Sequence, residues 1–173
     1  MQIAQKIAER KKKVAIISLE MSDVQLIQKL ISKKTGVNSY KMRSGNLVDD
    51  DWEKIAEGLG ELSDLPIRII TTAFNIQQIE KTIRKLKNKN ELDLVVIDYI
   101  QLIKNQGNFS SREQQVADIS RTLKLLTLEL NIPIIALCQL NRNANKTEPT
   151  LADLRESGSI EQDKSSRKLD KCA

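Results

Sequence analysis

Short apolar runs alternate along the chain with longer segments in which apolar residues recur every three or four positions. The apolar runs cover residues 14–19, 67–71, 94–97 and 133–137. Runs of this length predict strands, those at 94–97 and 133–137 buried on both faces, and the spacing between the runs predicts amphipathic helices. Because helices alternate with strands, the sequence predicts an α/β fold with a parallel sheet covered by helices on both faces.

Two of the predicted helices begin with the spacing of a capping box, in which a polar residue is followed three positions later by Gln. Ser22 precedes Gln25, and Asn75 precedes Gln78. The apolar positions that follow define one face of each helix. These positions are Val24, Ile27, Leu30 and Ile31 in the first helix, and Ile76, Ile79, Ile83 and Leu86 in the second.

Two further helices are predicted from other signals at their N-termini. Asp49 or Asp50 is expected to cap a helix whose apolar positions are Trp52, Ile55 and Leu59. Ser110 and Glu113 are expected to open a longer helix, whose apolar positions are Val116, Ile119, Leu123, Leu126 and Leu130. The regular spacing of this last set predicts a helix with one buried face.

The composition indicates one soluble globular domain. The chain has 173 residues, of which 40% are hydrophobic and 29% charged. No apolar run approaches the roughly 20 residues that span a membrane, and residues 1–13 lack the uninterrupted apolar stretch of a secretory signal. These features predict a cytoplasmic protein with no membrane partner.

The chain has no histidine and two cysteines, Cys138 and Cys172. This composition excludes mechanisms that need a histidine base and argues against a zinc site or a disulfide framework. Cys138 lies beside an apolar run and is predicted to be a small buried hydrophobe. The net charge of +5 is compatible with a polyanionic partner without identifying one.

Polar residues follow each predicted strand, at the end where parallel α/β sheets bind ligands. They are Glu20, Thr71 and Thr72, Asp98, and Gln139. A carboxylate at the end of a buried strand suits the water shell of Mg²⁺ at a nucleotide site. The same residue type also caps helices and stabilises loops, and the spacing alone favours neither interpretation of Asp98.

For the other candidates, the residues alone favour an ordinary structural role. Glu20 could polarise a water for attack on a γ-phosphate, but a Glu at this point also favours a helix N-terminus. Gln139 could contact phosphate, although Gln is common on loops. Arg155 and Gly158 could approach a phosphate, although their composition is typical of an exposed turn.

The 173 residues contain no G-x-x-x-x-G-K-[ST] motif and no Gly-Lys pair. That motif supplies the backbone amides, the lysine and the Mg²⁺-binding hydroxyl of a nucleotide motor. The six glycines, at positions 36, 45, 58, 60, 107 and 158, cannot form it.

Several segments nevertheless resemble the motor domain of DnaB-type replicative DNA helicases. Residues 17–22 resemble the signature after the family's second strand, and residues 96–102 resemble its Walker B segment. Further matches follow in the family's order at residues 111–116, 131–142 and 153–163. Because several motifs occur in the correct order, the chain is identified as a member of this family over residues 1–163.

The resemblance implies a RecA-like fold that uses ATP and Mg²⁺ to move along single-stranded DNA. By position, Glu20 corresponds to the catalytic base, Asp98 to the Walker B acid that holds Mg²⁺ through water, and Gln139 to a sensor of the nucleotide state. Arg155, Glu156 and Gly158 lie where the family grips the phosphate backbone of DNA.

The resemblance also predicts the domain organisation. Residues 1–163 are expected to form a partial motor domain, incomplete at both ends, and residues 164–173 an atypical flexible tail. Because the phosphate-binding loop and its strand would lie upstream, an exposed sheet edge is expected, and with it marginal stability or self-association. The family implies a homo-hexamer, with primase and helicase-loader contacts outside this chain.

Two other functions fit the sequence. A catalytically inactive RecA-like module could bind helicase subunits or DNA without turnover, which the missing lysine motivates. A RecA-like ATPase of the recombination or clock type would share the fold, because a fold does not fix a function. Residues 155–163 favour the helicase.

Overall fold

A computed structural model describes residues 1–107 and 109–139 of the chain. In this part the four strands form one sheet in the order β2-β1-β3-β4. The strands are β1 (Val14–Ser18), β2 (Ile67–Ile70), β3 (Leu94–Asp98) and β4 (Ile134–Ala136). Every neighbouring pair is parallel. The predicted α/β fold with a parallel sheet is therefore confirmed.

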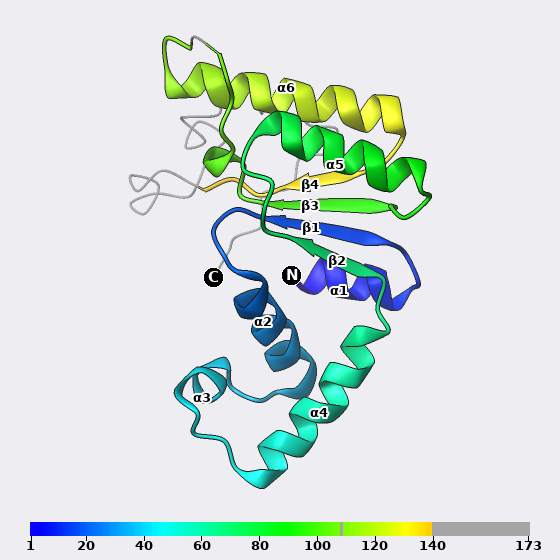
Figure 1. Cartoon of the computed structure of the whole chain (residues 1–173), viewed down its shortest axis with the longest axis vertical. Helices are drawn as coiled ribbons and strands as arrows, with labels where there is room; N and C mark the ends of the chain where they lie inside the picture. Colours follow the sequence, from blue (N-terminus) through cyan, green and yellow to red (C-terminus); the bar gives the residue numbers. More distant parts are fainter. Residues whose placement is uncertain (108, 140–173) are drawn as a thin grey trace, which may run out of the picture.

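The described residues also form six helices. They are α1 (Gln2–Glu9), α2 (Asp23–Thr35), α3 (Ser39–Ser44), α4 (Asp49–Ser63), α5 (Ile76–Asn88) and α6 (Arg112–Leu130). One turn of 3₁₀-helix, η1 (Ile100–Leu102), follows β3. In Figure 1, α5 and α6 lie on one side of the sheet, and α1 lies on the other.

The two central strands bury alternate residues on opposite faces of the sheet, as strand geometry requires. Ala15, Ile17, Val95 and Ile97 pack in one core with the apolar positions of α5 and α6. Val14, Ile16, Leu94 and Val96 pack in a second core with Ala4 and Ala8 of α1. Helices thus cover both faces, as predicted.

The helices α5 and α6 bury their predicted faces. The four apolar positions of α5 are 0–7% exposed, and Val116, Ile119, Leu123 and Leu126 of α6 are 0–5% exposed. The Asn75 side chain accepts a hydrogen bond from the Gln78 N–H, 2.8 Å away, which confirms the predicted cap. The cap of α6 is Ser111, one residue after the predicted Ser110, because the Ser111 hydroxyl accepts the Gln114 N–H at 3.2 Å.

The predictions for α2 and α4 hold only in part. The capping box of Ser22 and Gln25 is present, but Val24 is 59% exposed. In α4 the N-cap is Val48 and not an aspartate, and its N–H donates to the Asp51 carboxylate at 3.3 Å. Trp52 is 57% exposed. In Figure 1, α2, α3 and α4 extend away from the sheet, whereas α5 and α6 lie along it.

The strand β4 lies where the sequence predicts it, but the prediction of full burial is wrong. Ile134 and Ile135 are half-buried and Ala136 is exposed. Within the described residues β4 pairs with β3 alone, so it forms an edge of the sheet. None of the helices in residues 1–107 and 109–139 is both long and apolar enough to cross a membrane.

Candidate functional site

The strand register brings three of the predicted residues to one edge of the sheet. Ser18 of β1 pairs with Asp98 of β3, and the Leu19 N–H donates to the Asp98 carbonyl at 2.9 Å. On the other side of β3, the Ile100 N–H donates to the Leu137 carbonyl at 3.0 Å. Glu20 and Gln139 follow these contacts by one and two residues, so they flank Asp98 along the carboxyl edge.

A buried serine fixes the turn that carries Glu20. Ser18 is 2% exposed, and its hydroxyl accepts the Met21 N–H at 3.1 Å and donates to the Met21 carbonyl at 3.0 Å. The turn closes immediately before Ser22, the cap of α2. Glu20 is therefore exposed on a short turn that is held at both ends. Ser18 was not among the residues predicted from the sequence, although a serine at the end of an apolar run was a usable signal.

Asp98 ends β3, one of the two buried central strands of the sheet. The four residues before it are 0–4% exposed, whereas Asp98 itself is half-buried and reaches the edge. The Asp98–Tyr99 peptide bond is cis. A single half-buried carboxylate at this place can hold one or two of the waters around Mg²⁺, which binds proteins through few direct ligands.

The backbone of Gln139 is held by the side chain of Gln101. The Gln101 amide oxygen accepts the Gln139 N–H at 3.2 Å, and its amide nitrogen donates to the Gln139 carbonyl at 3.0 Å. The same nitrogen lies 2.8 Å from the sulfur of Cys138. Gln139 itself is exposed, so its side chain is available to a ligand. Cys138 is half-buried and packs against the core, where full burial was predicted.

An arginine from α6 holds Gln101 in turn. The Arg112 guanidinium donates to the Gln101 carbonyl and to the side-chain oxygen of Gln115. Neither Gln101 nor Arg112 was identified as functional from the sequence. Both lie in segments that carry the resemblance, Gln101 three positions after Asp98, and this was the one available signal.

The remaining predicted site residues, Arg155, Glu156 and Gly158, lie outside the described residues, as does the predicted tail at 164–173. Within residues 1–107 and 109–139, no group of three or more Cys, Asp or Glu side chains gathers in a way that could hold a metal ion.

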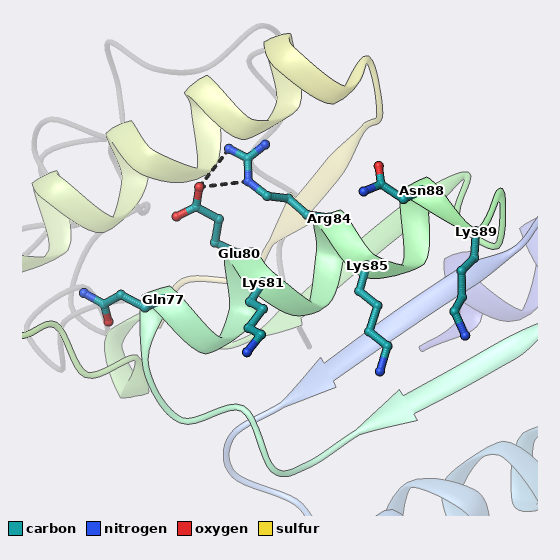
Figure 2. A pocket seen from close by; sticks show the side chains of 7 residues that line it. All are labelled: Gln77, Glu80, Lys81, Arg84, Lys85, Asn88 and Lys89. Atoms are coloured by element: carbon teal, nitrogen blue, oxygen red, sulfur yellow. Dashed lines mark hydrogen bonds and ion pairs between the residues drawn. The ribbon is translucent and has the colours of Figure 1, made fainter.

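A shallow hollow of about 620 Å³ lies elsewhere, on the outer side of α5. Figure 2 shows Arg84 and Glu80 on the side of this helix that faces α6, and Lys81, Lys85 and Lys89 on the other side. Arg84 binds Glu80 at 2.8 Å and also pairs with Glu129 of α6. These two carboxylates raise the pKa of Arg84, and Arg84 lowers the pKa of the Glu129 carboxyl.

Because Arg84 already has two carboxylate partners, it serves to join α5 to α6. All seven residues that line the hollow belong to α5 or its C-cap, Lys89. The hollow contains none of the residues at the ends of the strands. We therefore place the candidate site at the carboxyl edge of the sheet and not here.

The parallel sheet with helices on both faces matches the fold of RecA-like ATPase domains, as two solved structures show. The chain superposes on one solved ATPase domain with a TM-score of 0.86 and 34% identity, over 92% of this chain and 59% of that one. It superposes on a DnaB-like replicative helicase, solved with its interactions with primase, with a TM-score of 0.85 and 34% identity. That match covers 92% of this chain and 40% of the other.

Residues 1–166 match the family described as the DnaB-like helicase C-terminal domain, and the chain belongs to this family. It is 41% identical over 167 residues to the replicative DNA helicase DnaB of Geobacillus stearothermophilus, covering 93% of this chain and 37% of that protein. It is 43% identical over 155 residues to the DnaB of Helicobacter pylori, covering 87% of this chain and 32% of that protein. The chain thus spans about a third of these relatives.

Proposed function

We propose that the chain is part of the motor of an ATP-dependent replicative DNA helicase, which translocates on single-stranded DNA and unwinds the duplex at the replication fork. Residues 1–163 form the motor segment and residues 164–173 a tail. One observation carries the proposal. In a chain of the DnaB-like family, the strand register brings Glu20, Asp98 and Gln139 to one edge of the sheet.

In this proposal each residue at the carboxyl edge has one task. The exposed Glu20 carboxylate orients and deprotonates the water that attacks the γ-phosphate. Asp98 binds Mg²⁺ through its water shell. Gln139 contacts the phosphate and transmits the nucleotide state. When bound, Mg-ATP would supply the phosphoryl group, the counter-charge and the energy of translocation.

The DNA contacts in the proposal come from Arg155, Glu156 and Gly158. Arg155 supplies positive charge for a phosphate, and Gly158 lets the backbone approach the strand closely. The active form is a cytoplasmic homo-hexamer, and contacts with primase and the helicase loader involve other parts of the assembly.

The first experiment measures ATP hydrolysis by the purified chain with and without single-stranded DNA. We expect no turnover in either case, because the 173 residues contain no phosphate-binding loop motif. DNA-stimulated turnover would mean that another group replaces the lysine of that motif, and our account of the phosphate site would be wrong.

The second experiment tests DNA binding, by fluorescence anisotropy with a labelled oligo(dT). We expect Arg155→Ala to weaken binding and to reduce its dependence on salt. The matched control is Arg121→Ala, which removes an exposed arginine from α6. Equal affinity of the two variants would remove Arg155 from the proposed DNA site.

The absence of the phosphate-binding loop motif favours one alternative, a catalytically inactive module that binds helicase subunits or DNA. A pull-down with an intact homologous DnaB ring distinguishes it. Failure to bind either the ring or DNA contradicts it.

A further inference from the structure

We propose that Gln101 is a positioning residue, which holds the backbone of Gln139 at the carboxyl edge and is itself held by Arg112. We call this set of contacts the Gln101 clamp. Its importance for turnover rests on the proposed role of Gln139, but the clamp itself is a structural statement that can be tested without turnover.

The clamp begins where the sheet ladder ends. The last paired residues of β3 and β4 are Ile97 and Ala136. Two further backbone hydrogen bonds follow, from the Leu137 N–H to the Ile97 carbonyl at 2.9 Å and from the Ile100 N–H to the Leu137 carbonyl at 3.0 Å. Beyond this point, within the described part of the chain, no strand flanks residues 138–139 on the β3 side. The side-chain amide of Gln101 takes the place of a strand, because it offers one donor and one acceptor as a peptide group does.

Both polar atoms of the Gln101 side-chain amide form hydrogen bonds to Gln139. The oxygen accepts the Gln139 N–H at 3.2 Å, and the nitrogen donates to the Gln139 carbonyl at 3.0 Å. The second proton of the nitrogen can point to the Cys138 sulfur, 2.8 Å away. Two antiparallel hydrogen bonds to one residue fix its position and its rotation, which a single bond would not.

Arg112 fixes the other end of Gln101. Its guanidinium donates to the Gln101 carbonyl, a charge-assisted bond and therefore stronger than a neutral one. The guanidinium also binds Gln115, one turn further along α6, so the arginine is held on both sides. Since Ser111 caps the same turn, the start of α6 is a rigid support for Gln101.

The chemistry of the clamp demands glutamine at position 101. Asparagine is one methylene shorter and does not reach both groups of Gln139. Glutamate keeps the acceptor but turns the donor into a second acceptor, which faces the Gln139 carbonyl. Methionine matches the length of glutamine and makes neither bond.

The test uses amide hydrogen exchange measured by NMR on the whole 173-residue chain. In Gln101→Met we expect the Gln139 amide to exchange about five- to tenfold faster, the usual effect of one lost hydrogen bond. The Val96 and Ile97 amides, deep in the sheet, should keep their rates. The matched control is Gln77→Met, since in the described part of the chain the Gln77 amide makes one long hydrogen bond, of 3.5 Å, to the Asn105 side chain.

A second variant tests the contact between Arg112 of α6 and Gln101. Arg112→Lys keeps the charge but loses the planar fork, so the Gln139 amide should exchange about two- to threefold faster. A third measurement needs no variant. In the unmodified chain, the side-chain amide protons of Gln101 should exchange more slowly than those of Gln77, because only the former have close acceptors.

Three results would overturn the proposal. One is a Gln139 amide that exchanges at the same rate in a folded Gln101→Met variant. Another is an equal acceleration at Val96, Ile97 and Gln139, because Gln101 would then stabilise the fold as a whole. The third is a Gln101 side-chain amide that exchanges as fast as that of Gln77.

The outcomes separate the clamp from the proposed function. A protected Gln139 amide in a chain that fails to bind oligo(dT) or a homologous ring contradicts the helicase proposal and leaves the clamp intact. An unprotected Gln139 amide in a chain that binds both contradicts the clamp alone.

Discussion

The helices on the two sides of the sheet use their apolar residues in different ways. On one side, α5 and α6 bury every apolar position that repeats at helical spacing except Leu130, which is half-buried. On the other side, α2 and α4 leave Val24, Trp52 and Leu59 between 49% and 59% exposed. The helices have similar patterns, so the difference comes from what lies opposite each face (Figure 1). An apolar stripe predicts a helix reliably and its burial only where the fold supplies a partner.

The largest effect is expected in the core under α5. Ile83 is fully buried, so Ile83→Ala leaves a cavity beside the sheet. We expect the free energy of unfolding to fall by about 2–5 kcal/mol. Urea unfolding followed by circular dichroism measures it, with the slope of the transition unchanged. A loss below about 1 kcal/mol would mean that this side of the molecule is packed no better than the α2–α4 side.

The next effect is expected at the contact between α2 and α4. A Cβ on Gly58 would lie 2.3 Å from the Thr35 Cγ2 atom, while Gly60 has open space around it. Thr35 cannot turn away freely, because its hydroxyl donates to the Ile31 carbonyl and accepts the Val37 N–H. We therefore expect Gly58→Ala to destabilise the chain by about 1–2 kcal/mol.

The matched control for this prediction is Gly60→Ala, two positions along the same helix. It should stabilise the chain by about 0.5–1 kcal/mol, because alanine favours a helix interior. Opposite signs for the two variants in urea unfolding would show that α2 and α4 pack closely despite their exposed apolar residues. Equal signs would contradict the close approach.

A smaller effect depends on pH and on the pair that joins α5 to α6. Because Arg84 lowers the pKa of the Glu129 carboxyl, the pair stabilises the fold above the unfolded pKa of about 4.3. This contribution is lost as the pH falls through the lower folded value. The urea midpoints of the wild type and Glu129→Gln should therefore differ above about pH 5 and converge as the pH falls below about 4.5. A difference between the two urea midpoints that grows at low pH would mean that folding raises the pKa of the Glu129 carboxyl, which contradicts this prediction.

The smallest effect is expected at Trp52 of α4. The side chain is 57% exposed, so Trp52→Ala should change the free energy of unfolding by about 0.5 kcal/mol or less. The same urea titration measures it. A loss comparable with that of Ile83→Ala would mean that Trp52 is covered in solution, for example by a second copy of the chain.

The fold could be predicted from the sequence where local signals and long-range partners agree. Leu94–Asp98 is a strand because it is apolar up to its last residue, and it is buried because two other strands flank it. The cap of α6 was placed one residue too early, because Ser110 and Ser111 are both good caps and only the hydrogen bond to Gln114 distinguishes them. The exposure of Trp52 depends on where α4 points, and local spacing holds no information about that.

The residues of the candidate site also fall into two groups, those that could be predicted from the sequence and those that could not. The common location of Glu20, Asp98 and Gln139 could be predicted, because the ends of parallel strands meet at one edge of the sheet. Gln101 could not, because its partner Gln139 is 38 positions away in the sequence and no periodicity relates them. Likewise, Arg112 reaches the Gln101 carbonyl across 11 positions. Contacts of this kind are created by the fold and are visible only in it.

In the described part of the chain, β4 leaves one edge of the sheet unpaired, and a further strand could pair there. Among the described residues its outer backbone groups face no other strand, so an additional strand can pair there without rearranging the rest. A strand that paired in parallel would run in the same direction as β4 and end beside Gln139. An additional strand at this edge of the described sheet would therefore place its last residues next to the candidate site.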